Sequence, residues 1–196
     1  SIASGNTAFA SGSKTIAQGD FSTAMGDISV ASGKISFAAG FRDSATGDFS
    51  TAIGYNSLAS KSYSTAIGAF ASSTGLYSIA LGLSTKASGN NSVAFGSSTY
   101  AIGNFSTAGG HYSTASGLNS TAFGYNTLAS GDYSIAMTEN SIAAGDYSIA
   151  MGQSSAALGL KAFAAGNNDS AMQNYGIAIG NNNKALKQFS TAIGSY

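Results

Sequence analysis

Small residues recur at intervals of seven along the whole chain. If every seventh position is taken from Gly5 to Gly194, glycine fills 24 of the 28 places. The residue two places earlier is alanine in 27 cases, and the residue four places earlier is serine or threonine in 21. The glycine series is interrupted at Lys61, Thr138, Gln173 and Lys187. We expect ordinary turns at these four positions, the alternative being turns that are redirected for function. Repetition without insertions predicts one architecture, a single domain over residues 1–196.

Each unit reads Ser-x-Ala-x-Gly-x-x and alternates with a period of two. This predicts a five-residue strand with Ser, Ala and Gly on one face and the two variable residues on the other. The next two residues would form a turn, where glycine supplies a positive φ and asparagine tolerates one. A coiled coil is disfavoured because glycine costs roughly 1 kcal/mol relative to alanine in a helix, and no apolar a/d seam is present. Short strands and turns at constant spacing predict an all-β solenoid.

Successive units differ in the residue just before glycine. In one set this residue is apolar at 12 of 14 positions, and in the alternate set it is polar at nine of 14. Aromatic residues, from Phe21 to Phe189, open the apolar strand. By parity, we expect them to point the same way as the residue before glycine. The repeat is therefore a coil of 14 residues with two unlike strands, and the chain holds about 14 such coils.

The pattern also predicts self-association. Ser, Ala and Gly facing inward leave a thin core that is weak on its own, while one outer wall carries a continuous apolar row. Because a soluble monomer seldom exposes more than a few hundred Å² of contiguous apolar surface, we expect copies of the chain to cover this wall. The opposite wall, with residues such as Ser32, Thr46 and Ser60, would face water. The expected interface residues are Phe21, Met25, Phe49, Ile53, Tyr63, Ile67, Tyr77, Leu81, Phe95, Phe123, Tyr133, Met137, Tyr147, Met151, Ile179, Phe189 and Ile193.

Composition and charge exclude several classes of partner. Eight Lys and Arg residues balance eight Asp and Glu residues, so no net positive field attracts nucleic acid. Without cysteine and with one histidine, the chain lacks the usual ligands of a metal centre, and we expect no metal and no cofactor. No apolar run reaches about 18 residues, so this part of the protein is not expected to insert into a membrane. The start at Ser1, without a signal-peptide pattern, suggests a piece of a longer protein.

Candidate catalytic residues lack the partners that chemistry requires. His111 is the only histidine, and no Gly-x-Ser-x-Gly elbow accompanies the many serines, so hydrolysis is not expected. The aspartates Asp20, Asp27, Asp43 and Asp48 fall in turns or at coil edges, where we interpret them as turn formers. A solenoid polysaccharide lyase is one alternative, although no catalytic constellation supports it. We expect no enzymatic activity.

Four segments resemble a known family. Asn91–Gly96 (Asn-Ser-Val-Ala-Phe-Gly), Asn119–Gly124, Asn140–Gly145 and Phe49–Gly54 are similar to the head repeats of YadA-like trimeric autotransporter adhesins, and the similarity covers essentially the whole chain. The resemblance implies a left-handed parallel β-roll, a parallel homotrimer and display on the cell surface from a bacterial outer membrane. The handedness rests on the resemblance alone. The signal peptide, neck, coiled-coil stalk and membrane anchor of such proteins would lie outside this chain.

The family implies cell adhesion and virulence, with host extracellular matrix or cell-surface proteins, including collagen, as partners. Asn91, Val93 and Phe95 lie in the segment that best matches a collagen-linked motif, although the same motif is the consensus that forms the coils. Lys86, Tyr100 and Lys184 would protrude from the polar wall as ligand contacts, because exposed aromatic and cationic groups are typical of interfaces.

An ice-binding solenoid is the main alternative function. A flat row of threonines on a rigid sheet is the feature that would favour it. The row here is incomplete and falls on the apolar wall, which counts against this use. Its members are Thr23, Thr51, Thr65, Thr107, Thr121 and Thr191.

Overall fold

A computed structural model describes residues 1–195, which form strands joined by turns, with no helix in that range. The chain divides into two compact units, Ser1–Ser98 and Thr99–Tyr196. In each unit seven short strands alternate with seven longer ones. The prediction of an all-β parallel solenoid built from 14-residue coils is confirmed.

Short and long strands alternate strictly in the first unit. Its short strands are β1 (Ile2–Ala3), β3 (Ile16–Ala17), β5 (Val30–Ala31), β7 (Ser44–Ala45), β9 (Leu58–Ala59), β11 (Ser72–Ser73) and β13 (Lys86–Ala87). Its long strands are β2 (Phe9–Ser13), β4 (Thr23–Asp27), β6 (Phe37–Phe41), β8 (Thr51–Tyr55), β10 (Thr65–Ala69), β12 (Ile79–Leu83) and β14 (Val93–Ser97).

The second unit repeats this arrangement. Its short strands are β15 (Tyr100–Ala101), β17 (Thr114–Ala115), β19 (Leu128–Ala129), β21 (Ile142–Ala143), β23 (Ala156–Ala157), β25 (Ser170–Ala171) and β27 (Lys184–Ala185). Its long strands are β16 (Thr107–His111), β18 (Thr121–Tyr125), β20 (Ile135–Glu139), β22 (Ile149–Gln153), β24 (Phe163–Asn167), β26 (Ile177–Asn181) and β28 (Thr191–Ser195).

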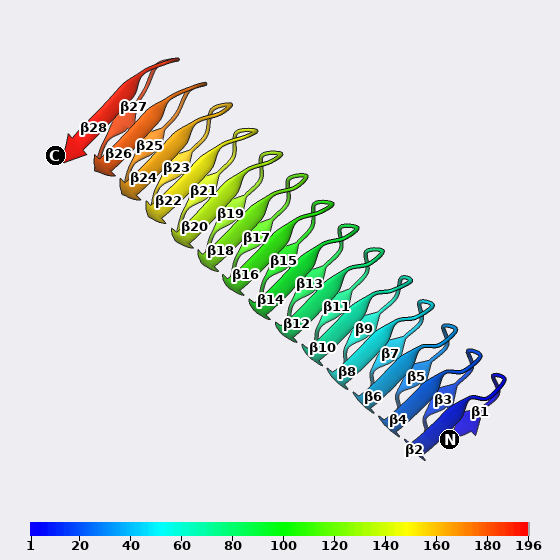
Figure 1. The fold of residues 1–196 in the computed structure, drawn as a ribbon. Helices are drawn as coiled ribbons and strands as arrows, with labels where there is room; N and C mark the ends of the chain where they lie inside the picture. Colours follow the sequence, from blue (N-terminus) through cyan, green and yellow to red (C-terminus); the bar gives the residue numbers. More distant parts are fainter. Residues whose placement is uncertain (196) are drawn as a thin grey trace. The chain divides into compact units, whose positions relative to one another are not determined.

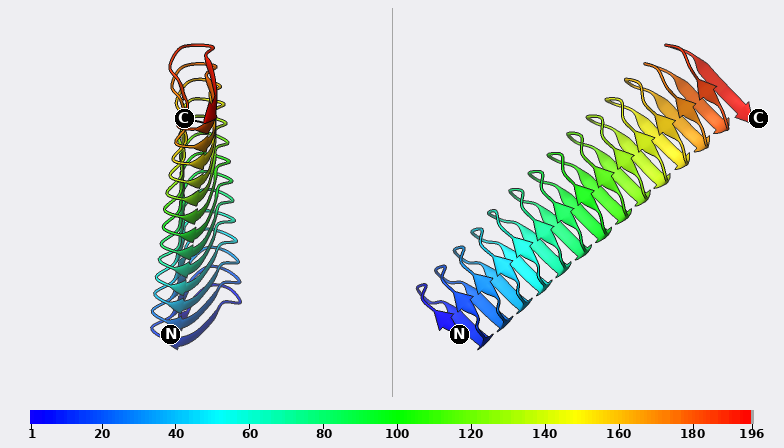
Figure 2. Two further views of the ribbon diagram at one scale, coloured as in Figure 1. Left: turned by 90° about the vertical axis from the view of Figure 1, so that its left-hand side faces the viewer. Right: turned by 180° about the vertical axis from the view of Figure 1, so that it is seen from behind.

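Within each unit, long strands pair only with long strands and short strands only with short strands. All of these pairs are parallel, and partners are 14 residues apart, as in the series Ala52, Ala66 and Ala80. Figure 1 shows the long strands as one layer, and the views in Figure 2 show the short strands as a second layer behind them. Equivalent residues of successive coils therefore form straight rows along each layer.

The core between the two layers consists of small side chains. The inward alanines of both strand types, such as Ala66 and Ala59, are fully buried. Serines beside them are also buried, and many of them bond to backbone carbonyls. Ser57 Oγ donates to Gly68 O at 2.9 Å, and Ser36 Oγ donates to Gly33 O at 2.6 Å. The expected inward face of Ser and Ala is confirmed, with threonine or aspartate at a few of the serine positions.

The two halves of the repeat differ more than the sequence predicts. A five-residue strand of the type Ser22–Gly26 was expected in every seven-residue unit, but one half forms Thr23–Asp27 and the other only Val30–Ala31. The prediction that glycine supplies a positive φ in the turns is wrong: the positive-φ glycines of the series lie inside long strands, with φ between +99° and +146°. A Cβ there would meet the next coil's backbone, as at Gly54, where it would lie 2.0 Å from Gly68 O.

The corners use left-handed residues that are seldom glycine. Every seventh residue from Thr7 to Phe189 has a φ between 53° and 60°. Asparagine fills some of these corners, but many hold aromatic residues. Most corner residues donate their N–H to the preceding coil, as Tyr63 N does to Asp48 O at 2.8 Å. The aromatics therefore lie at corners, and the parity rule that predicted their direction does not apply to them.

The interrupted glycine positions behave in two ways. Lys61, Gln173 and Lys187 avoid a positive φ, as expected for ordinary turns. Thr138 does not: it lies in a long strand with φ at 88°, and its Oγ1 accepts the N–H of Gly152 at 2.9 Å. The pairing of β20 with β22 stops at Met137. A side chain at this glycine position therefore interrupts the local ladder.

Candidate functional site

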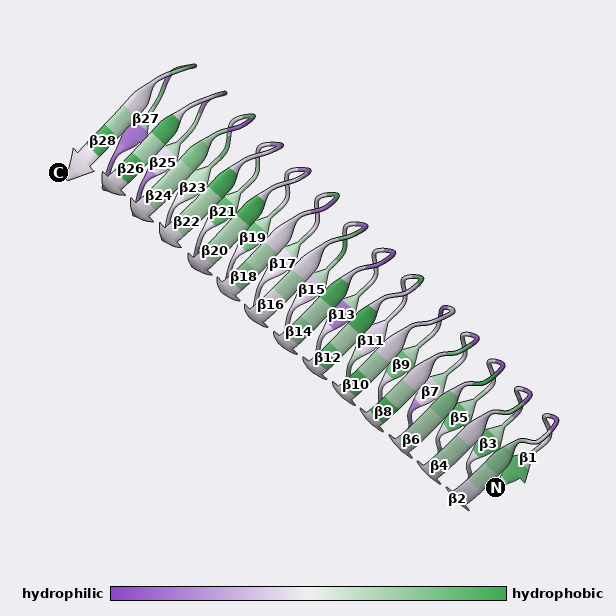
Figure 3. Ribbon diagram, viewed as in Figure 1, coloured by the Kyte–Doolittle hydropathy of each residue, from purple (hydrophilic) through white to green (hydrophobic). Residues whose placement is uncertain are grey.

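The outward residues of the long strands form an apolar wall, which we call the long-strand wall. It consists of the first and third residues of each long strand. Ile67 and Leu81 each leave 38% of their surface exposed, and Phe123 leaves 48%. Figure 3 shows apolar colour on most of the long strands. Because the coils are in register, the third residues form an unbroken row in the first unit from Met25 to Phe95. The expected wall is present, and the contact between copies stays a prediction.

The corner aromatics beside this wall stack into short ladders. The rings of Phe49 and Tyr63 lie 4.8 Å apart, and those of Tyr63 and Tyr77 lie 4.7 Å apart. In the second unit, Tyr133 and Tyr147 stack at 5.0 Å. Stacking of this kind is worth about 0.5–1.5 kcal/mol beyond burial, which offsets part of the cost of the left-handed corners. These rings remain half exposed.

The opposite surface, the short-strand wall, consists of the first residue of each short strand and the residue just after that strand. Lys86, Tyr100 and Lys184 are exposed on it, as expected. In the second unit, however, the residues after β23, β25 and β27 are apolar and also exposed: Leu158, Met172 and Leu186. Only the first unit carries the polar row that the sequence predicted along its length.

The candidate ligand contacts do not form one cluster. Lys86 lies on β13 in the short-strand wall, whereas Val93 and Phe95 lie on β14 in the long-strand wall. Asn91 occupies a corner with φ at 55°. Tyr100 belongs to the second unit. Asn91, Val93 and Phe95 occupy positions that recur in the other coils, and their contact with a ligand stays a prediction.

The threonines proposed for ice binding do not form an array. They occupy the first position of long strands, where Phe37, Ile79 and Val93 interrupt them in the first unit. In the second unit, Ile135, Ile149 and further apolar residues interrupt them. A surface that orders water needs a regular row, so the structure does not support this alternative.

His111 shows no catalytic arrangement. It ends β16 and is exposed, its ring stacked on Tyr112 at 4.0 Å and edge-on to Tyr125 at 5.5 Å. Among residues 1–195 no group of three His, Asp, Glu or Cys side chains comes together that would hold a metal ion. In the same range no helix is long and apolar enough to cross a membrane.

The four aspartates do not share one role. Asp20 Oδ1 accepts the N–H of Asn6 at 2.8 Å, and Asp48 Oδ1 accepts that of Lys34 at 2.9 Å, so these two are turn formers as predicted. Asp27 ends β4. The prediction is wrong for Asp43, which is fully buried in the core at a position where serine is usual. The repeat pattern indicates burial, because position 43 is equivalent to the inward serines. The turn prediction gave more weight to the preference of aspartate for turns.

Asp43 is held by backbone donors of the next coil. Its Oδ2 accepts the N–H of Gly54 at 2.7 Å, and its Oδ1 accepts that of Ser57 at 2.8 Å. Burial nevertheless raises the pKa of the Asp43 carboxyl above its ordinary value of 3.8, because loss of water outweighs these hydrogen bonds. The folded chain therefore keeps a proton that the unfolded chain releases as pH rises above 3.8.

Asp43→Ser is expected to stabilise the protein at neutral pH. Between the ordinary and the raised pKa, stability of the natural chain falls as pH rises, and above that range the full cost of the buried charge remains. Removing it should raise the free energy of unfolding by about 1–2 kcal/mol at pH 7, with the gain shrinking as pH falls to the ordinary value. Urea unfolding at a fixed protein concentration across this pH range measures the effect. Asp48→Ser is the control, and an equal gain for both variants would contradict the expectation.

Comparison with protein families agrees with this geometry. The model described as YadA head domain repeat (2 copies) matches residues 17–42, 45–71, 73–99, 96–118, 115–137, 139–155 and 174–196. A search of curated proteins returns no match. The matched segments cover most of the chain and follow the coils in both units. The repeats are those of an adhesin family displayed at the cell surface, and the chain belongs to the YadA head repeat family.

Proposed function

We propose that this chain is the adhesive head of a bacterial surface fibre, assembled as a parallel homotrimer of left-handed rolls. The observation that carries the proposal is the apolar long-strand wall, whose residues run in register from coil to coil and remain half exposed in the single chain. Exposed apolar surface of this extent marks an interaction site. The number of copies and the left-handed winding follow from the resemblance to trimeric autotransporter adhesins.

Assembly through the long-strand wall leaves the short-strand wall and its corners free. These surfaces repeat every 14 residues and occur three times in the trimer, so they suit a repetitive ligand better than a single small molecule. Linked copies can raise overall affinity by about 10²–10⁴ without new contacts. We expect the ligands to be host matrix or cell-surface components, with collagen as one candidate.

Binding of the purified chain to immobilised collagen and other matrix proteins tests the proposal. The assembled chain should bind at least one of them, with a slower dissociation than a variant that cannot assemble, and should not bind serum albumin. Absence of binding to every matrix protein and to host cells would contradict the adhesive role. Binding of equal strength by assembled and dissociated chains would contradict the role of avidity.

A further inference from the structure

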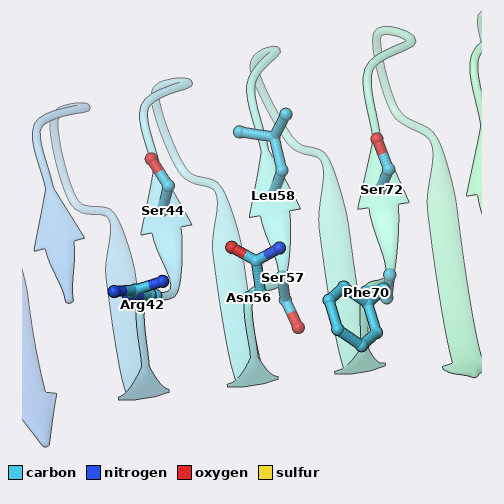
Figure 4. Close-up of a pocket in the computed structure, with 8 residues that line it drawn as sticks. Arg42, Ser44, Asn56, Ser57, Leu58, Phe70 and Ser72 are labelled. Carbon is cyan, nitrogen blue, oxygen red and sulfur yellow. The ribbon is translucent and has the colours of Figure 1, made fainter. Parts of the chain in front are cut away.

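A hollow opens on the short-strand side of the first unit. Its volume is about 360 Å³. Figure 4 shows two rows of side chains around it, with Arg42, Asn56 and Phe70 at the corners of three successive coils and Leu58 standing between two serines on the short strands. The serines are Ser44 and Ser72, and their small size on both sides of Leu58 creates the space. The hollow lies away from the long-strand wall, so the proposed trimer leaves it accessible.

One aromatic ring, that of Phe70, lines the hollow, and neighbouring rings hold it in place. Phe41 and Tyr55 stack at 5.2 Å, and Tyr55 meets Phe70 edge-on at 5.2 Å. Phe70 leaves half of its surface exposed. An exposed ring held in place by its neighbours offers a fixed apolar face at little cost in side-chain entropy.

Arg42 is the only arginine of the chain. The guanidinium carbon lies 5.2 Å from the centre of the Phe41 ring, which orients the side chain. Among residues 1–195, no carboxylate forms an ion pair with it: Asp27, one coil earlier, makes none, and Asp43 points into the core. A planar guanidinium without an ion-pair partner is suited to bidentate binding of a carboxylate.

The amide of Asn56 is also unused. At equivalent corners of the second unit, Asn126 donates to Asn140 at 2.8 Å and Asn168 donates to Asn182 at 2.7 Å. Asn56 lies between Arg42 and Phe70 and, within the described part of the chain, its side chain has no hydrogen-bond partner. The hollow therefore places a free amide donor and acceptor beside a free cation and an aromatic face.

We propose that this hollow binds a sugar residue that carries a carboxylate, with Arg42 on the carboxylate, Asn56 and the two serines on ring hydroxyls, and Phe70 and Leu58 against the apolar face of the ring. The inference rests on the proposed adhesive function, for which it names one ligand chemistry. An extended peptide fits less well, because peptides commonly add to a free strand edge and β7, β9 and β11 are paired on both sides.

Saturation-transfer NMR with the full chain tests the inference. The acidic probes are methyl glucuronide and the methyl glycoside of N-acetylneuraminic acid, and the neutral probe is methyl glucoside, which differs from the glucuronide only at the carboxylate. At least one acidic sugar should bind about tenfold or more tightly than methyl glucoside, because a hydrogen bond to a charged group is worth more than a neutral one. N-acetylglutamate serves as a carboxylate that lacks a sugar ring.

Matched variants assign the binding to this hollow. Arg42→Gln should remove the preference for the acidic sugar, whereas Lys34→Gln removes the same charge from an exposed turn outside the hollow and should not. Phe70→Ala should weaken acidic and neutral sugars alike, whereas Tyr112→Ala, at the equivalent corner of the second unit, should not. Equal loss in both members of either pair would overturn the proposal.

Two further results would also overturn it: absence of binding by both acidic sugars, and tighter binding of N-acetylglutamate than of either sugar. Sedimentation of the same samples shows whether the sugar-binding proposal fails alone or the proposed trimeric head fails as well. Loss of sugar binding in an intact assembly refutes the hollow alone, whereas a monomeric natural chain refutes the trimeric head.

Discussion

Ile67→Lys is expected to dissociate the assembly and, with it, to destabilise the fold. Ile67 lies on β10 in the long-strand wall, in register with Ile53 and Leu81. In a parallel trimer, three copies of the new ammonium group would be brought together in an apolar contact. Each buried unpaired charge costs several kcal/mol, which exceeds what an outward isoleucine contributes to a single chain.

Sedimentation and far-ultraviolet circular dichroism at matched concentrations measure this effect. Because the core holds little beyond alanine and serine, the variant should lose both the trimer mass and strand signal at dilutions where the natural chain keeps them. Thr74→Lys is the control, since it adds the same charge to the short-strand wall of the same unit. A variant at Ile67 that keeps its mass and its melting temperature would contradict the assignment of this wall.

Gly68→Ala is expected to lower the free energy of unfolding by on the order of 3 kcal/mol. Gly68 has a φ of +136°, and a Cβ there would lie 2.0 Å from Gly82 O of the next coil. The neighbour is backbone and cannot rotate away, so the coils must separate locally. Thr138 shows the natural form of this adjustment, because the ladder between β20 and β22 stops beside it.

Gly176→Ala provides the matched control. Gly176 stands at an inward position where serine is usual, and a Cβ there would meet Gln173 O at 3.0 Å and alanine carbons at 3.6 and 3.7 Å. Alanine already occupies the equivalent position at Ala162 and is buried. Thermal unfolding should show a small effect or a gain for this variant. Equal losses for the two glycines would contradict the close approach of coils at Gly68.

The sequence predicts the coil because its two periods are explicit. Alanine and glycine at constant spacing specify a thin parallel roll, and the alternation of apolar and polar residues before glycine separates the two walls. The corners could not be predicted in the same way. A left-handed Tyr63 is unfavourable by local preference, and it is held there by its hydrogen bond to the preceding coil and by stacking on its neighbours.

The unequal strand lengths and the buried Asp43 could not be predicted either, because they depend on contacts between coils and not on local preference. Both halves of the repeat carry glycine, and a Cβ in either half would meet the backbone of the next coil, but only the glycines inside long strands take a positive φ. Asp43 faces the core, whereas the preference of aspartate for turns predicts a turn position. The hollow beside Arg42 depends on residues 14 apart, such as Ser44, Leu58 and Ser72, and the single arginine among lysines was its only sequence signal.

Sedimentation equilibrium of the unmodified chain over a range of dilutions is the most direct measurement of whether the exposed apolar wall joins copies together. We predict a mass three times that of one chain, persisting to micromolar concentrations, with strand content lost only when that mass is lost. A single chain that remains fully folded at micromolar concentration would contradict the proposal.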